Sequence, residues 1–134
     1  MRFFAFIAFW LLPIGAFAQS RSDYETTMQH FREHFNRGDA KEIRAMFSGS
    51  WGKRKKQLWP QHQLDEVRSD YGKMLSCTYV TIDTVSDENR LALFKVVYEK
   101  ETFMTAFNLD RAKKFRTFRL NTSSPFIDGL LKKP

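Results

Sequence analysis

The chain has 134 residues, a formal net charge of +7 and a single cysteine, Cys77. This length suffices for one domain around one core, and a lone cysteine excludes an intrachain disulfide and a cysteine-based metal site. The surplus of cations favours anionic partners but carries no information on the fold.

The first 18 residues have the pattern of a signal peptide. Arg2 precedes the apolar run Phe3–Leu12, which Pro13 breaks, and the small-x-small sequence Ala16–Ala18 suits signal peptidase. The run is too short for an ordinary membrane span, although an uncleaved anchor or a buried N-terminal helix remains as an alternative. We therefore expect cleavage near Ala18-Gln19 and an exported protein, periplasmic or extracellular, for which nucleic acid is not an expected partner.

A long helix is predicted to begin at Ser22. Ser22 and Glu25 have the spacing of a capping box, in which each side chain bonds the other residue's backbone N–H. Gly38 suits the left-handed conformation that ends many helices. Between these ends, large apolar residues recur at spacings of three and four, which places them on one face: Tyr24, Met28, Phe31 and Phe35.

Two shorter helices are predicted to follow. Asp39 and Glu42 form a second candidate capping box, and Ser48-Gly49-Ser50 ends that helix, whose apolar face contains Ile43, Met46 and Phe47. From Gln61 to Tyr71, apolar residues again recur at helical spacing, and Gly72 ends the helix. The segment 51–60 between these two helices shows no clear periodicity.

From residue 74 the apolar period changes from 3.6 to 2, which is typical of strands. An antiparallel meander of four strands is predicted: Met74–Asp83, Arg90–Lys100, Thr102–Leu109 and Phe115–Leu120, with a turn at Ser86–Asn89. Phe115 and Phe118 fall in opposite phases, so we expect a bulge or an early end of the strand there. Residues 121–134 are predicted to be a tail, which four apolar residues could dock as a short turn: Phe126, Ile127, Leu130 and Leu131.

Helices followed by strands predict an α+β fold, with N-terminal helices packed on a curved four-stranded antiparallel meander. Residues 1–18 would be the signal peptide, 19–120 a single domain and 121–134 the C-terminal tail. The second face of the sheet must be covered by the short helices, the tail or a partner. Because both phases of Leu91–Tyr98 carry apolar residues, a homodimer through the sheet face is compatible with the sequence.

The pattern Phe31-x-x-x-Phe35-Asn36-x-Gly38-Asp39-Ala40-x-x-Ile43-x-x-Met46-Phe47, followed by a helix ending in Gly72 and a β-meander, resembles the nuclear transport factor 2-like superfamily. It is most similar to the small exported bacterial domains of unknown function in that group. The resemblance covers residues 22–120 and implies a cone-shaped, cystatin-like fold in which a bent sheet wraps round the long helix. The superfamily includes isomerases, cyclases, hydratases and non-catalytic binding domains, so the resemblance does not define a function.

No catalytic set is predicted. Enzymes of the superfamily place a carboxylate base inside the apolar cone, whereas Asp83, Glu99 and Glu101 stand at strand ends here. Tyr79 and Tyr98 lie within strands and could point inward. Together with two aromatic residues of the third strand they form the predicted ligand pocket: Tyr79, Tyr98, Phe103 and Phe107.

No cofactor or metal is predicted either. His30 and His34 have a spacing that can bind a metal on a helix face, but a zinc site needs three or four ligands and the sequence offers no acidic or third histidine ligand nearby. The chain also contains no P-loop, no Gly-x-Gly-x-x-Gly and no Gly-x-Ser-x-Gly motif.

Cations flanked by indoles make the best candidate contact surface: Trp51, Lys53, Arg54, Lys55, Lys56 and Trp59. Such a group suits anionic head groups, phosphates or sugars. The alternative is a solvated loop whose tryptophans pack into the core. The sequence thus predicts an exported non-catalytic binding domain for a small apolar ligand or a protein. The alternatives are an isomerase- or cyclase-like enzyme using the cone, and a binder of anionic surfaces through Lys53–Lys56.

Overall fold

The computed structural model describes residues 20–83 and 91–122. The predicted signal peptide with its cleavage site, the turn at Ser86–Asn89 and the tail from residue 123 onward lie outside these residues. Among the helices that are described, none has the length and apolar character needed to cross a membrane.

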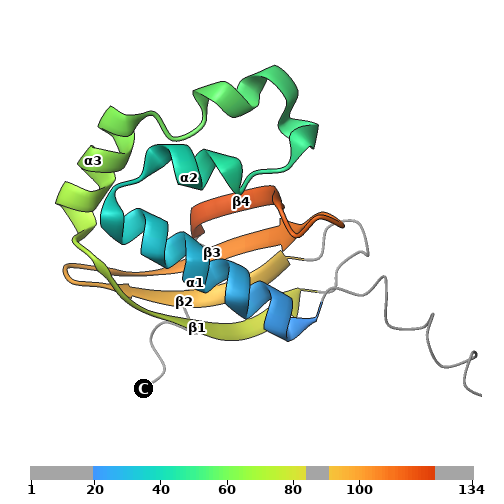
Figure 1. Cartoon of the computed structure of the whole chain (residues 1–134). Helices are drawn as coiled ribbons and strands as arrows, with labels where there is room; N and C mark the ends of the chain where they lie inside the picture. Colours follow the sequence, from blue (N-terminus) through green and yellow to red (C-terminus); the bar gives the residue numbers. More distant parts are fainter. Residues whose placement is uncertain (1–19, 84–90, 123–134) are drawn as a thin grey trace, which may run out of the picture.

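Helices cover one face of a four-stranded antiparallel sheet (Figure 1), so the predicted α+β class is confirmed. The longest helix, α1, lies across that face, and α2 and α3 lie on the same side of the sheet. In chain order the elements are α1 (Arg21–Arg37), α2 (Ala40–Ala45), the 3₁₀ helix η2 (Gly49–Gln57), α3 (Gln61–Tyr71), β1 (Met74–Asp83), β2 (Leu91–Tyr98), β3 (Thr102–Leu109) and β4 (Phe115–Thr122).

The N-terminal cap of α1 differs from the prediction. The cap residue is Ser20, not Ser22: the Asp23 N–H donates to Ser20 Oγ at 3.1 Å, and the Ser20 N–H donates to the Asp23 carboxylate at 3.1 Å. The predicted partner, Glu25, instead forms an ion pair with Arg21 at 2.7 Å. Both serines stand three residues before an acidic residue, so the sequence allows either box, and the earlier one gives the longer helix.

The predicted end of the first helix at Gly38 is confirmed. Gly38 ends α1 in the left-handed conformation, with φ 71° and ψ 32°. Asp39 then caps α2, since its side chain accepts a hydrogen bond from the Glu42 N–H at 3.2 Å. α2 ends at Ala45, before the predicted stop at Ser48-Gly49-Ser50, and the segment that lacked a pattern contains η2.

The sheet has the predicted meander order, β1-β2-β3-β4. β1 and β3 have the predicted bounds. β2 ends at Tyr98, before the predicted Lys100, while Arg90 lies outside the described residues, and β4 continues beyond Leu120 into the segment predicted as tail.

The bulge expected between Phe115 and Phe118 is present. Leu109 pairs with Phe115 and Asn108 pairs with Thr117, so β4 carries one extra residue at this point. Both phenylalanines consequently contact each other, with ring centroids 4.8 Å apart. The bulge lets two residues of opposite phase enter the same core.

The main core lies between the helices and the sheet. The largest fully buried side chains of this core come from α1, α2, α3 and all four strands: Phe31, Phe35, Phe94, Phe107, Phe115, Met28, Ile43, Leu64, Met74 and Val96. The apolar stripe predicted for the first helix is buried as expected.

The sheet also carries a second, smaller apolar cluster. Leu93, Met104 and Ala106 are 6, 1 and 1 % exposed and alternate along β2 and β3 with residues of the main core. A homodimer through the sheet face, which the sequence allows, would therefore find little exposed apolar surface on these residues. Within residues 20–83 and 91–122, one large apolar side chain is exposed: Leu75 of β1, at 53 %.

Candidate functional site

A hollow of about 330 Å³ lies between η2, α3 and β4. We call it the indole groove because two tryptophans, at opposite ends of the segment 51–59, meet there. The lining is mostly apolar: Phe47, Trp51, Gln57, Leu58, Trp59, Gln63, Val67, Phe118 and Leu120. The predicted residues Trp51 and Trp59 are thus brought together, whereas the contributions of α3 and β4 were not predicted.

Trp51 is held against the start of β4. Its Nε1 donates to the Phe115 carbonyl at 3.3 Å, and its ring packs edge-to-face on Phe47 with centroids 5.8 Å apart. Phe47 itself forms a parallel backbone bridge with Phe115. The cap of η2 is also anchored, since the Ser48 hydroxyl donates to the Asp110 carboxylate at 2.6 Å. Trp51 is therefore fixed by its polar atom and one face, and the half-buried ring lines the groove.

Trp59 lines the groove in a strained backbone conformation. Its φ is 52°, in the left-handed region, where a residue with a side chain loses about 1–2 kcal/mol. Arg44 Nη1 donates to the Trp59 carbonyl at 3.0 Å, and the ring contacts Phe31 and Phe118 with centroids 5.8 and 6.1 Å away. Non-glycine residues in this region are enriched at ligand-binding positions, so Trp59 is a candidate site residue.

The predicted cations follow Trp51 on η2. Gly52 interrupts the helix with φ 56° and ψ −133°, and the second part of η2 contains the basic run. Lys55 is half-buried, whereas Lys53, Arg54 and Lys56 are exposed. None of the four side chains lines the indole groove itself.

A second hollow, of about 470 Å³, lies between α1, α2 and the turn that joins β3 to β4. We call it the polar hollow. Its lining is Asp23, Thr26, Thr27, His30, His34, Glu42, Ala45, Met46, Ala112, Lys113 and Lys114. The sequence analysis missed this site, although the polar positions 23, 26, 30 and 34 recur at helical spacing and so indicate a shared flank of α1.

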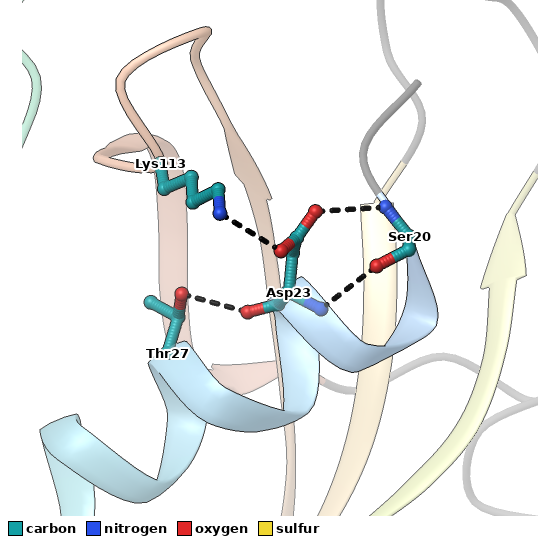
Figure 2. A network of polar contacts seen from close by, with 4 residues as sticks. All are labelled: Ser20, Asp23, Thr27 and Lys113. Atoms are coloured by element: carbon teal, nitrogen blue, oxygen red, sulfur yellow. Dashed lines mark hydrogen bonds and ion pairs between the residues drawn. The ribbon is translucent and has the colours of Figure 1, made fainter. Parts of the chain in front are cut away.

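A network of polar contacts joins Ser20 to three residues that line the polar hollow (Figure 2). Lys113 Nζ lies 3.1 Å from the Asp23 carboxylate, which also belongs to the capping box of α1. The Thr27 hydroxyl donates to the Asp23 carbonyl at 2.8 Å. The hydrogen bond from the Ser20 N–H and the contact with Lys113 hold the pKa of Asp23 below its usual value, against a smaller effect of desolvation.

Asp110 shapes the turn that carries Lys113. Its Oδ1 accepts hydrogen bonds from the N–H groups of Ala112 and Lys114 at 2.8 and 2.9 Å. Desolvation raises the pKa of Asp110, but the hydrogen bonds from Ser48 and from these backbone groups outweigh it, so the net shift is downward. Lys113 takes a left-handed φ of 62°.

The two histidines of α1 line the polar hollow with two carboxylates, Asp23 and Glu42. Glu42 reaches this hollow because α2 packs beside α1, a contact that the sequence analysis did not predict. His34 Nδ1 is buried without a hydrogen-bond partner. In residues 20–83 and 91–122, however, no group of three or more potential ligands is arranged to hold a metal ion.

The four residues of the predicted ligand pocket pack into the main core, and none lines either hollow. Phe107 and Tyr98 are buried, at 0 and 2 % exposure. Phe103 and Tyr79 are half-buried, and the Arg21 guanidinium lies 4.5 Å from the centre of the Tyr79 ring.

Two protonated groups lie in this part of the core. Burial raises the pKa of Tyr98, with Cys77 and Tyr71 acting in the same direction, and its hydroxyl has no hydrogen-bond partner. Burial also raises the pKa of the Cys77 thiol to about 11, although Arg32 opposes the shift. Both groups stay protonated near neutral pH, so the Cys77 thiol is not activated as a nucleophile.

Comparison with protein-family models, with curated proteins and with solved structures finds no match for this chain.

Proposed function

We propose that this chain is an exported, non-catalytic binding domain whose ligand places its apolar part in the indole groove. The observation that carries the proposal is the groove itself, about 330 Å³ in volume and lined mainly by apolar side chains. Ligand pockets typically have volumes of about 300–1,000 Å³, with hydrophobic and aromatic walls and a few polar groups that orient the ligand. Gln57 and Gln63 are the polar groups here.

The lining of the groove supports binding rather than catalysis. None of its nine side chains is ionisable, so the groove holds no general acid, general base or activated nucleophile. An isomerase-like enzyme in the core would need a base beside a tyrosine. Tyr98 has no hydrogen-bond partner for its hydroxyl, and Glu99 and Glu101 are exposed. The binding function therefore has the better support.

The fold that we propose for the domain is the nuclear transport factor 2-like cone. Three features support it: the order of helices before the meander, the position of α1 across one face of the sheet (Figure 1), and the bulges in β1 and β4, which bend strands. An experimental structure tests this assignment by superposition on members of that superfamily, and a flat sheet would contradict it.

Export is part of the proposal and has its own test. Expression of the full chain in a bacterial host, followed by N-terminal sequencing of the extracytoplasmic protein, is expected to give Gln19 as the first residue. An unprocessed N-terminus on all of the protein would contradict cleavage near Ala18-Gln19.

The groove is tested by the fluorescence of its own tryptophans. In the full chain carrying Trp10→Phe, the two remaining tryptophans both line the groove. We expect decanol to shift their emission saturably. Gln63→Phe fills the groove from an exposed position of α3 and should weaken binding at least tenfold, whereas Gln29→Phe, at an exposed position of α1, should not. Equal binding of decanol by the two variants would show that the ligand does not occupy the indole groove.

A further inference from the structure

We propose that the ligand of the indole groove is a free single-chain amphiphile with an anionic head group, whose head is held by Arg54 and Lys55. This inference rests on the proposed function, because it assigns a ligand class to the same groove. Three observations carry it: where the cations lie, the absence of charge partners for them, and the shape and chemistry of the groove.

The cations lie one helical turn from the groove. Residues three apart lie on the same face of a 3₁₀ helix, about 6 Å apart along its axis. Arg54 therefore precedes Gln57 on one face of η2, and Lys55 precedes Leu58, to which it is linked by the Leu58 N–H···O=C Lys55 hydrogen bond of 3.3 Å. Because Gln57 and Leu58 line the groove, the two cations stand at its rim.

Among the described residues, neither Arg54 nor Lys55 forms an ion pair. No Asp or Glu occurs between Glu42 and Asp65, a segment that contains five lysine or arginine residues. The two ion pairs in the described part of the chain, Arg21–Glu25 and Lys113–Asp23, involve other elements. An anionic group at the mouth of the groove therefore meets cations without displacing a carboxylate.

The indole groove can hold an alkyl chain, but none of its lining side chains is charged. Its volume is near the lower limit for ligand pockets, which suits one alkyl chain. An anion inside it would be desolvated beside Trp51, Trp59 and Phe118 without a charge partner. The apolar part of the ligand thus belongs in the groove and the anion at the rim, which is the arrangement of an anionic amphiphile.

The test compares ligands that differ in their head group but share the same ten-carbon alkyl chain. The full chain with Trp10→Phe is titrated, below the micelle-forming concentration of each probe, with decanoate, decanol and decyltrimethylammonium. We expect decanoate to bind about tenfold more tightly than decanol, as a few partly exposed charge pairs allow, and the cation to bind more weakly than decanol. Octanoate should bind roughly tenfold more weakly than decanoate because two methylenes leave the groove.

A double variant assigns the head group to the rim. Arg54→Ser with Lys55→Ser should bring decanoate to the affinity of decanol and leave decanol unchanged. Arg116→Ser with Arg119→Ser removes the same charge from exposed positions of β4 and should preserve the preference for decanoate. Raising the salt concentration towards 1 M, where the screening length is about 3 Å, should also reduce the preference.

Each outcome separates this inference from the proposed function. If decanol binds as tightly as decanoate, the inference that the ligand has an anionic head group is wrong, but the groove is still a ligand-binding site. If anionic vesicles bind while free decanoate does not, the free amphiphile is overturned in favour of a bilayer. If no probe changes the tryptophan emission, the proposed function itself fails.

Discussion

Asn36, near the end of α1, exchanges two hydrogen bonds with the backbone of Met74, the first residue of β1. Asn36 Nδ2 donates to the Met74 carbonyl at 3.0 Å, and the Met74 N–H donates to Asn36 Oδ1 at 2.8 Å. The carboxamide thus pairs with β1 as a neighbouring strand would. The backbone carbonyl of Asn36 also accepts a hydrogen bond from Arg68 at 2.9 Å, so this one residue joins α1, α3 and the sheet.

We expect Asn36→Asp to lower the free energy of unfolding by about 1–3 kcal/mol. The carboxylate keeps the shape of the carboxamide but cannot donate to the Met74 carbonyl, which then faces a like partial charge. Chemical denaturation at neutral pH measures the loss. Asn121→Asp, at an exposed position of β4, should change stability by less than about 0.5 kcal/mol, and an equal effect of the two substitutions would contradict the role of Asn36.

Gly38→Ala should destabilise the domain by about 1–2 kcal/mol or more. The residue has a left-handed φ of 71°, and a Cβ there would also clash with the Arg68 guanidinium, which bonds the end of α1. Gly49→Ala is the matched control, because its φ is not in the left-handed region and a Cβ would meet no atom within 4 Å. Urea titration measures the free energy of unfolding of both variants. Equal values would show that residue 38 does not need the left-handed conformation.

Asp23→Asn should lower the melting temperature at neutral pH but not in strong acid. The folded-state pKa of Asp23 lies below its ordinary value, so the carboxylate stabilises the fold above the unfolded pKa of about 4 and loses this effect as the pH falls through the folded pKa. Thermal unfolding of wild type and variant between pH 7 and about pH 2 measures the difference. Asp110 titrates in both proteins, so its contribution cancels in the comparison. A difference that persists in strong acid would show that the substitution acts through something other than charge.

Tyr98→Phe should leave stability unchanged or raise it by up to about 1 kcal/mol, because it removes a buried hydroxyl without a hydrogen-bond partner and keeps the packed ring. Most substitutions at a 2 % exposed position destabilise, so the expected sign is unusual. Denaturant midpoints measure the change. A loss greater than about 1 kcal/mol would mean that the hydroxyl is paired in solution.

Features set by neighbouring residues were predictable from the sequence. Gly38 and Gly72 end helices as expected, and the change of period at residue 74 marks the start of β1, because caps and amphipathic patterns act within a few residues. The start of α1 was misplaced where Ser20 and Ser22 offer equivalent caps. A local rule can recognise a capping box, but the longer helix is chosen by packing along its whole length.

The sites depend on contacts between distant segments, and these were not predictable. The tryptophans could be singled out as aromatic residues beside cations, but their partners Phe118 and Leu120 belong to a strand that the sequence places far away. Lys113 reaches Asp23 for the same reason. Only the pairing of β4 with β3 and with Phe47 brings these residues together. The apolar pattern within a single helix or strand does not predict such pairing.

The bridge between Phe47 and Phe115 limits how much of the domain can fold while the chain is still being synthesised. It rests on two backbone hydrogen bonds of 2.8 Å, from the Ser48 N–H to the Phe115 carbonyl and from the Phe115 N–H to the Met46 carbonyl. A nascent chain that ends before β4 has the three α-helices, η2 and three strands, but it lacks Phe115 and Phe118, on which Phe47 and Trp59 pack. Such a chain exposes apolar surface that chaperones recognise, so the groove is completed only after β4 has been synthesised.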